Sequence, residues 1–385
     1  GRSPLLALTA GLRSSAWPAQ SAGGFGEVTE ADGALRVGPH LPLLSERYRF
    51  VRRLGRGASS VVFEAVDCVW CVPRLVAVKA LHRQFARAGL QEAQLVRLVG
   101  ALNPGGGARC ARLYGVFDFR GHVCLVFEHL GGGGLYDLIR FSLDNDFGFE
   151  KGATTVALNG GPWAVRSPRP PPALARPPPA MIVDATRKVA FQLISALAFL
   201  HGHGLIHADI KPENVLLEKA RGLEALAGAG EGASGLGLRL IDFGNAFPEA
   251  LAPAFRGTQD LQSLPYRAPE VLFGLEFGCA VDCWSAGIVL AELCLRRTLF
   301  LAPSGSELVR QMCEAFGSAP PAHPFAGGAH ARFICAAAGV ELARSDASPS
   351  PRWSATPPDP SAGVVGCRPE SERGLFAALR SFHPA

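Results

Sequence analysis

Residues 48–67, with the sequence YRFVRRLGRGASSVVFEAVD, contain the pattern that most restricts how this chain can fold. Apolar and polar residues alternate on both sides of Gly55 and Gly57, and a period of two is typical of β-strands. Glycine also tolerates the backbone angles that tight turns need. The segment therefore predicts a strand, a turn and a second strand.

The residues that follow predict more sheet and one helix. Residues 74–81 and 122–130 are apolar runs of strand length, while residues 90–99 have the spacing of an amphipathic helix. The apolar stripe of that helix consists of Leu95, Leu98 and Val99. Glu92 is expected to lie off this stripe. Regular structure is thus predicted to begin near Glu46, with a first part that is mostly sheet.

The downstream part is predicted to be helical, with two insertions. Residues 184–201 have apolar residues at steps of three and four behind a capping Asp184, and residues 280–293 are apolar nearly all round. This second helix should therefore lie in the middle of its lobe. Residues 145–180 are rich in proline and residues 219–237 are rich in glycine and alanine, so both are expected to be surface insertions.

Composition excludes several classes of partner. The chain has 385 residues, of which 48% are hydrophobic, so it can bury a sizeable core. Its net charge of +5 is small and dispersed, which argues against a nucleic-acid partner. No apolar run reaches the length needed to cross a bilayer, which argues against a membrane partner.

The cysteines and the N-terminal residues bear on the compartment. The ten cysteines have no repeating frame, and the CxxC at Cys68–Cys71 has no second pair at zinc-ribbon spacing. We favour free thiols in a reducing compartment. Metal or redox use of that pair is the alternative. Residues 1–26 contain arginine and no acidic residue and faintly resemble a transit peptide, although a disordered leader over residues 1–46 is favoured. We expect an intracellular protein, cytoplasmic or nuclear, with organelle targeting left open.

Residues 207–217, HADIKPENVLL, combine an acid, a lysine and an amide at a spacing that suits phosphoryl transfer. Asp209 can accept a hydrogen bond from an attacking hydroxyl group, and Lys211 can neutralise charge on the transferred phosphate. The amide oxygen of Asn214 can bind a metal ion. Asp242 follows an apolar strand, where it can hold Mg²⁺ together with Asn214. Polar loops are common, so neither the motif at 207–217 nor Asp242 decides the function alone.

Further motifs complete the set in chain order. LGRGASSVV at 54–62 fits a glycine-rich loop whose backbone amides can approach phosphates, with Ser60 where a third glycine is usual. Lys79 ends VAVK on the third predicted strand, and Glu92 on the next helix can pair with it. A solvated strand end and an ordinary helix charge are the alternative interpretations of these two residues. The strand before Glu128–Leu130 leads into an edge that can offer backbone hydrogen bonds to a purine.

Together with YRAPE at 266–270 and DCWSAG at 282–287, these motifs resemble a eukaryotic protein kinase over about residues 47–301. CLVFEHL followed by GLYDLIR, then TRKVAFQL, IHADIKPENVLL, and LQS followed by YRAPEVLFGLEF, are similar to the dual-specificity tyrosine-regulated and homeodomain-interacting kinases of the CMGC group. The resemblance implies an α+β, bilobal fold. A small β-rich N-lobe and hinge would occupy residues 47–130, and a larger helical C-lobe, incomplete at its end, residues 131–385.

The resemblance also implies a protein serine/threonine kinase that uses ATP and Mg²⁺ and acts on protein substrates. Lys211 in the catalytic loop follows the serine/threonine pattern. Lys79, oriented by Glu92, would hold the α- and β-phosphates, and Asp209 would orient the substrate hydroxyl group. The implied magnesium ligands are Asn214 and Asp242. The implied ATP-binding residues are Leu54, Gly55, Arg56, Gly57, Ala58, Ser59, Ser60, Val61, Val62, Ala77, Lys79, Phe127 as gatekeeper, Glu128 and Leu130.

Several residues depart from the family pattern and bear on regulation. Ala208 stands where kinases that need a loop phosphate usually have arginine, and Asp260 stands where the family has a tyrosine. Because its carboxylate carries a permanent negative charge, we expect Asp260, with Arg267, to order the loop without modification. The alternative is that Asp260 caps a turn. Leu264 and Pro265 replace an Arg-Tyr pair, which puts a proline-directed preference in doubt.

Two departures concern the C-terminal half. No residue matches the later arginine that pairs with the A-P-E glutamate in the family, so Glu270 is expected to lack a buried partner. Residues 372–385 resemble the start of the late kinase helices, after which the sequence stops, and we expect an incomplete gene model. The proline-rich run at 167–180 could dock a proline-reading domain, although a plain insertion is favoured.

Three functions are compatible with the sequence. An active serine/threonine kinase is favoured because every site residue is present. A catalytically weak scaffold with a kinase fold is the alternative, supported by the altered loop and the incomplete end. A small-molecule phosphotransferase would share the Asp…Asn…Asp core, but VAVK, APE and DxWSxG argue against it.

Overall fold

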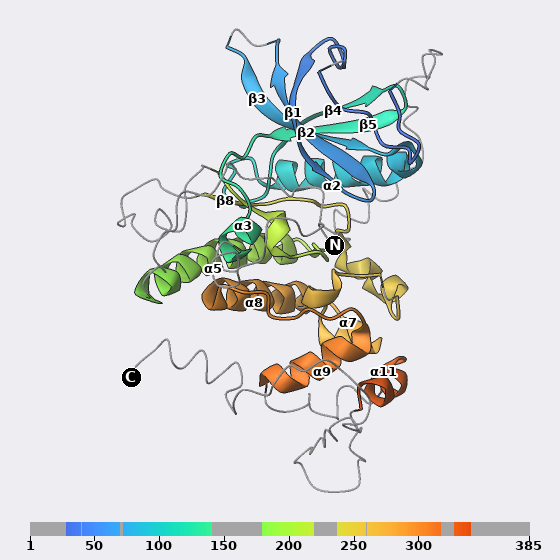
Figure 1. Cartoon of the computed structure of the whole chain (residues 1–385), viewed down its shortest axis with the longest axis vertical. Helices are drawn as coiled ribbons and strands as arrows, with labels where there is room; N and C mark the ends of the chain where they lie inside the picture. The colour runs from blue at the N-terminus through green and yellow to red at the C-terminus, as the bar shows by residue number, and fades with distance from the viewer. Residues whose placement is uncertain are drawn as a thin grey trace, which may run out of the picture.

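The computed structural model describes residues 28–39, 41–69, 72–140, 179–218, 237–258, 260–316 and 327–339. Two lobes are visible in Figure 1, a sheet with one long helix and a larger helical lobe below it. The chain passes from the first lobe to the second after strand β5. The α+β, bilobal fold class predicted from the sequence is therefore confirmed.

A five-stranded antiparallel sheet forms the N-lobe, in the order β1-β2-β3-β5-β4. Its strands are β1 (Tyr48–Arg56), β2 (Ser60–Asp67), β3 (Arg74–Leu81), β4 (Leu113–Phe119) and β5 (His122–Glu128). The sheet contains every strand predicted for the N-lobe, whereas period-two patterning does not predict β4, whose residues are mostly half-buried. Lys79 pairs with Val62 on β2 and with Leu125 on β5, so it lies in the middle of the sheet.

Helix α2 (Ala86–Leu102) packs on β4 and β5 and is longer than the helix predicted over residues 90–99. Its buried residues are Gly89, Glu92, Ala93, Val96 and Val99. Glu92 thus lies on the buried face, and the expectation that it lies off the apolar stripe is wrong. The physical reason is that Lys79 supplies a cation at 2.8 Å, which offsets the cost of burying the carboxylate.

Part of the predicted leader packs on the outer face of the sheet. The buried residues of this segment are Val28, Ala34, Leu35 and Leu44. Three of them share a cluster with Phe63 of β2 and Val78 of β3, which corrects the leader boundary for residues 28–39 and 41–46. The segment consists of isolated bridges and turns, so it has no strand or helix period that pattern analysis could detect. Residues 1–27 lie outside the described part of the chain.

The C-lobe is built around α5 (Pro179–Gly202) and α8 (Ala280–Leu295), which pack against each other. Eight of the 16 residues of α8 are buried, so the helix contributes to the core of its lobe, although it also has exposed residues such as Cys283 and Gly287. Asp184 is not the cap of α5, because the helix begins at Pro179. Asp184 instead forms an ion pair with Lys188, one turn further along the helix, with 3.0 Å between Oδ2 of Asp184 and Nζ of Lys188.

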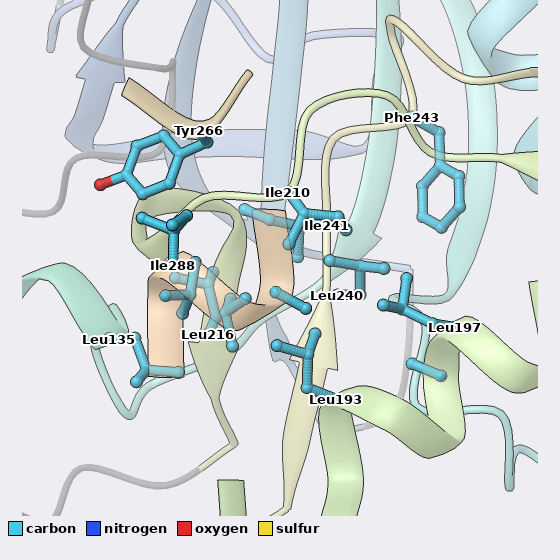
Figure 2. Packing of buried hydrophobic residues seen from close by; sticks show 14 of the residues in the cluster. Leu135, Leu193, Leu197, Ile210, Leu216, Leu240, Ile241, Phe243, Tyr266 and Ile288 are labelled. Atoms are coloured by element: carbon cyan, nitrogen blue, oxygen red, sulfur yellow. The ribbon is translucent and has the colours of Figure 1, made fainter. Parts of the chain in front are cut away.

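Shorter elements surround this helix pair. They are α3 (Leu135–Arg140), β6 (Leu205–Ile206), β7 (Val215–Leu217), β8 (Leu238–Leu240), β9 (Phe247–Pro248), α7 (Pro269–Phe273), α9 (Gly305–Phe316), α11 (Ala331–Ala338) and the 3-10 helices η3 (Arg83–Phe85), η4 (Pro212–Asn214), η5 (Glu249–Phe255) and η6 (Leu264–Tyr266). β6 pairs with β9, and β7 pairs with β8. Figure 2 shows Leu193 and Leu197 of α5 beside Leu216, Leu240 and Ile241, so the core supports both strands that lead into the site.

Several predictions fall outside the described residues. Residues 141–178 and 219–236 contain nearly all of the two insertions, and residues 372–385 contain the late helical segment. Cys68 is a free thiol, whereas Cys71 lies outside the described residues, so the use of that pair stays a prediction. Within the described ranges, every helix is too short or too polar to span a bilayer.

Candidate active site

Asp282, in the first turn of α8, fixes the backbone of the loop that carries the HADIKPENVLL motif. Its buried carboxylate accepts hydrogen bonds from the backbone N–H groups of His207 at 2.8 Å and Ala208 at 2.9 Å. It also lies 3.0 Å from Nε2 of His201 on α5. Ala208 has a φ of 62°, in the left-handed region, and these bonds hold that strained backbone in place.

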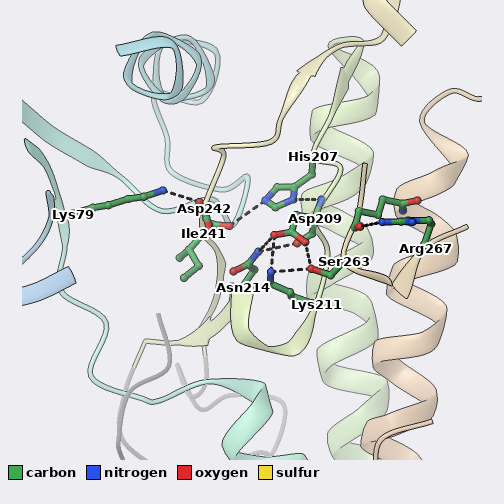
Figure 3. Close-up of polar contacts among 10 residues, drawn as sticks. Lys79, His207, Asp209, Lys211, Asn214, Ile241, Asp242, Ser263 and Arg267 are labelled. Carbon is green, nitrogen blue, oxygen red and sulfur yellow. Dashed lines mark hydrogen bonds and ion pairs between the residues drawn. The ribbon is translucent and has the colours of Figure 1, made fainter. Parts of the chain in front are cut away.

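The loop brings Asp209, Lys211 and Asn214 together, as the sequence predicts (Figure 3). Lys211 Nζ lies 2.7 Å from Oδ2 of Asp209, and Asn214 Nδ2 donates to the backbone oxygen of Asp209 at 2.8 Å and to Oδ2 at 3.2 Å. Ser263 adds a member that motif analysis missed, because its hydroxyl group donates to Oδ1 of Asp209 at 2.8 Å and accepts from Lys211 at 3.0 Å. The carboxylate of Asp209 is thus held in one orientation from three sides.

Lys79, Glu92 and Asp242 form a buried charge cluster between the lobes. Lys79 Nζ lies 2.8 Å from both carboxylate oxygens of Glu92 and 2.8 Å from Oδ1 of Asp242. Burial alone would lower the pKa of Lys79, but the two carboxylates outweigh it and raise that pKa. Burial raises the pKa of Glu92, whereas Lys79 keeps the pKa of Asp242 below its ordinary value. The lysine therefore stays charged and oriented.

An apolar pocket lies beside this cluster, between the two lobes. Its lining residues are Leu54, Ala77, Ala111, Phe127, Glu128, His129, Leu130, Leu216 and Ile241. The sequence predicts five of these as ATP-binding residues, Leu54, Ala77, Phe127, Glu128 and Leu130. Of the other four, Ala111 lies in no recognised motif, whereas His129, Leu216 and Ile241 lie in or beside motifs that were not linked to the nucleotide. Leu216 and Ile241 reach the pocket because β7 and β8 bring them beneath the sheet. A mostly apolar pocket of this kind, beside the backbone of Glu128–Leu130, suits a purine ring.

Apart from Lys79 on β3, the remaining predicted ATP-binding residues lie in the turn between β1 and β2 or at the adjoining ends of these two strands. Gly57 N donates to the backbone oxygen of Ser60 at 2.8 Å, and the backbone oxygen of Ser59 accepts from His82 N at 2.8 Å. Val62 belongs to the core cluster that includes pocket residues. The side chain of Val61 instead packs in the cluster on the outer face of the sheet, with Phe63 and Val78. Val61 can therefore contribute only its backbone to the pocket side.

The residues present fit a magnesium ion held together with phosphates. Oδ1 of Asn214 is buried and has no hydrogen-bond partner among the described residues, although an amide oxygen normally needs one. The backbone N–H of Ile241 donates to Asn214 O at 3.0 Å, which fixes Asn214 beside Asp242. No group of three or more His, Cys, Asp or Glu side chains gathers among the described residues as a metal site. Mg²⁺ is commonly held by one or two carboxylates plus substrate phosphates, so one acid and one amide suffice.

Comparison with known families decides the identity of this arrangement. The family model described as "Protein kinase domain" matches residues 48–321. The chain belongs to the protein kinase family. Over 289 residues this kinase domain is 27% identical to serine/threonine-protein kinase AFC2 of Arabidopsis thaliana, which covers 72% of this chain and 58% of that protein.

Two further relatives support the same identity. The kinase is 28% identical over 285 residues to dual specificity protein kinase CLK1 of Homo sapiens, covering 72% of this chain and 50% of that protein. It is 30% identical over 282 residues to serine/threonine-protein kinase ppk5 of Schizosaccharomyces pombe, covering 72% of this chain and 27% of that protein. The predicted protein kinase of the CMGC group is confirmed, and the chain spans only about a quarter to three fifths of the curated relatives it matches.

Gln262, which motif analysis missed, fixes the loop before α7. Its Nε2 donates to Ser285 Oγ at 2.8 Å and to the backbone oxygen of Val281 at 3.0 Å, while its Oε1 accepts from Ala268 N at 3.0 Å. Gln262 has a φ of 62°, and these bonds offset the strain. The LQS run that contains it was informative only as part of the family resemblance. The loop is thus attached to α8 by neutral hydrogen bonds.

The three predicted regulatory residues lie around this loop. Arg267 donates to the backbone oxygens of Leu261 at 2.9 Å and Gln262 at 3.0 Å, and burial lowers its pKa while the charge of Asp260 opposes that shift. Asp260 is exposed, and no ion pair within 4 Å joins it to Arg267 in the described residues. Burial raises the pKa of Glu270, for which the described residues supply no ion-pair partner.

Proposed function

We propose that this chain is a serine/threonine protein kinase that transfers the γ-phosphate of ATP to hydroxyl groups of protein substrates. The observation that carries the proposal is the assembled charge cluster, in which Lys79 lies 2.8 Å from both Glu92 and Asp242. A scaffold without activity has no need to hold two buried charges and one partly buried charge in this geometry, since an unpaired or misplaced member costs stability.

The site residues divide the work by their positions. ATP with Mg²⁺ would supply the transferable phosphoryl group and most of the positive charge around it. Lys79 is proposed to hold the α- and β-phosphates, with Glu92 orienting its ammonium group. Asn214 and Asp242 are proposed to hold the metal, and the unpartnered Oδ1 of Asn214 supports this role.

Asp209 and Lys211 are proposed to act on the substrate side. Asp209 is held by Ser263 and Asn214, so its carboxylate can orient a substrate hydroxyl group without a change of conformation. Lys211 Nζ, 2.7 Å from Asp209, places a positive charge where the phosphate in transfer becomes negative. Catalysis would then consist mainly of positioning and electrostatic stabilisation.

A transfer assay with radiolabelled ATP, Mg²⁺ and a generic basic protein tests this function directly. We expect labelled protein whose acid hydrolysis releases phosphoserine and phosphothreonine, because Lys211 follows the serine/threonine pattern. Label in phosphotyrosine as well would make the enzyme dual-specificity. No label above that of a heat-inactivated sample would contradict the proposal and favour a scaffold.

We also propose an intracellular site of action, cytoplasmic or nuclear. Supporting it, the described cysteines are free thiols, as expected in a reducing compartment. The proline-rich run at 167–180 is proposed as the segment that a proline-reading domain would bind, on the basis of its composition.

Activity without a loop phosphate is proposed from the neutral attachment of the loop by Gln262, to which Asp260 adds its charge beside Arg267. Asp260→Ala should lower transfer by unphosphorylated enzyme about twofold to fivefold, a small effect because the carboxylate is exposed and screened. Initial rates measured on enzyme shown by mass spectrometry to carry no loop phosphate check this result.

Glu276→Ala is the matched control, since Glu276 is also exposed and pairs with Arg256 at 2.9 Å. If Asp260→Ala and Glu276→Ala leave the rate equally unchanged, Asp260 acts at most as a turn cap.

A further inference from the structure

An arginine of the glycine-rich loop is held by two carboxylates from outside the predicted kinase domain. Arg56, between Gly55 and Gly57, lies 2.5 Å from Oε2 of Glu30 through one guanidinium nitrogen. Its other terminal nitrogen contacts the carboxylate of Asp32. These hydrogen bonds raise the pKa of Arg56. We call the residues that supply both acids, 28–36, the N-terminal turn.

The N-terminal turn is a built structure. Glu30 N donates to Ala34 O at 2.8 Å, Gly33 N donates to Glu30 O at 2.9 Å, and Arg36 N donates to Val28 O at 2.7 Å. Gly33 has a φ of 83°, which only glycine adopts easily. The buried side chains of Val28 and Leu35 in this turn join the cluster on the outer face of the sheet. The acids are therefore presented on a rigid support, so pairing with Arg56 costs little ordering of the turn.

The same turn contacts the connection between β3 and α2. Arg83 N donates to Gly33 O at 3.1 Å, and Gln84 Nε2 donates to Asp32 O at 3.4 Å. His82, just before them, donates its backbone N–H to Ser59 O in the glycine-rich loop at 2.8 Å. The N-terminal turn, the loop and the start of the segment that carries Glu92 are thus joined at one place.

We propose that Glu30 and Asp32 are positioning residues that set the affinity for ATP by fixing the glycine-rich loop through Arg56. The inference rests on the proposed function, because it concerns the loop expected to cover the phosphates. Gly55 and Gly57 make the loop intrinsically mobile, so an anchor between them reduces the conformational freedom that nucleotide binding would otherwise remove. Arg56 itself then acts away from the phosphates, although it occupies a phosphate-binding motif.

A different role for Arg56 makes the opposite prediction. If Arg56 released the two acids and contacted phosphate directly, neutralising Glu30 and Asp32 would free it and tighten ATP binding. If the acids anchor the loop, neutralising them loosens it and weakens ATP binding. The sign of the change therefore separates the two roles.

The test uses the full chain with the double variant Glu30→Gln/Asp32→Asn and with Arg56→Ala. The Kd for a non-hydrolysable ATP analogue with Mg²⁺, measured by calorimetry, should rise about threefold to tenfold in either variant, a range set by two partly exposed ion pairs. Combining all three changes should add little, because they break the same contact. In active enzyme KM for ATP should rise in step while kcat changes less than KM.

The matched control is Arg310→Ala, which removes an arginine paired with two glutamates on α9, far from the loop in Figure 1. This control should leave Kd unchanged. Unchanged or tighter binding in the Glu30/Asp32 variant, or fully additive effects, would overturn the proposal.

A second measurement does not depend on nucleotide or activity. Amide hydrogen exchange in residues 55–60 of the nucleotide-free chain should become several-fold faster in the Glu30→Gln/Asp32→Asn variant and stay unchanged in Arg310→Ala. If the wild-type chain binds no nucleotide, the proposed function fails, and this exchange result still decides whether Glu30 and Asp32 anchor the loop. Equal exchange in all variants would refute the anchor.

Discussion

Asp242→Asn should reduce phosphate transfer by about a hundredfold to a thousandfold or more while the protein stays folded. The carboxylate is the only acid proposed to hold the metal, and asparagine would leave one weaker neutral ligand beside Asn214. The fold should persist because Lys79 still has both oxygens of Glu92 at 2.8 Å. Initial rates with saturating ATP and Mg²⁺, together with a thermal melt, measure both quantities.

Asp184→Asn provides the comparison for this variant. It also replaces an aspartate that pairs with a lysine, at 3.0 Å from Lys188, but on the surface of α5. Transfer by this control should match the wild type. If Asp242→Asn keeps wild-type activity, Asp242 is not a metal ligand and the assignment of the site is wrong.

Lys79→Met should abolish transfer and also lower the free energy of unfolding by up to about 3 kcal/mol, because it leaves the buried carboxylate of Glu92 and the partly buried carboxylate of Asp242 without their cation. The fold should survive, since Glu92 can take up a proton. Burial already raises the pKa of Glu92, and Lys79 opposes that shift, so removing Lys79 raises the pKa further.

The raised pKa of Glu92 determines how the stability of the Lys79→Met variant changes with pH. The folded variant binds the Glu92 proton more tightly than the unfolded chain, whose glutamates titrate near about 4.3. Stability of Lys79→Met should therefore fall, relative to the wild type, as the pH rises above that value. Urea unfolding at pH 5 and pH 8 measures the difference, with Lys188→Met as a surface control. If the difference in free energy of unfolding between the variant and the wild type does not change with pH, Glu92 does not take up a proton when Lys79 is removed.

The sequence predicted which polar groups gather in the candidate site because each of them lies in a local motif. Asp209, Lys211 and Asn214 lie within a few residues of each other, and their contacts in Figure 3 follow from one loop. Lys79 and Glu92 are also brought together by neighbouring elements. Local spacing is enough to predict such groups, although it placed Glu92 on the wrong side of its helix because apolar patterning ignores a charge buried by its partner.

Residues supplied by distant segments could not be predicted in the same way. Ser263 reaches Asp209 across more than fifty positions, and Asp282 binds the loop at Ala208 from another helix. Val28 and Leu44 are buried although the segment that contains them has neither helix nor strand periodicity. Such contacts depend on how the lobes fold together, which neither hydrophobic period nor turn chemistry describes.

Phe127 has a consequence for the chemistry of inhibitors. Its backbone pairs across the sheet with Ala77, and its buried side chain lines the candidate purine pocket together with Leu216 of the lower lobe. A competitive inhibitor must therefore be flat enough to lie between Ala77 and Leu216 and compact enough to stop at the phenyl ring. Selectivity would then have to come from contacts with other lining residues, such as His129 and Leu130, rather than from groups that reach behind Phe127.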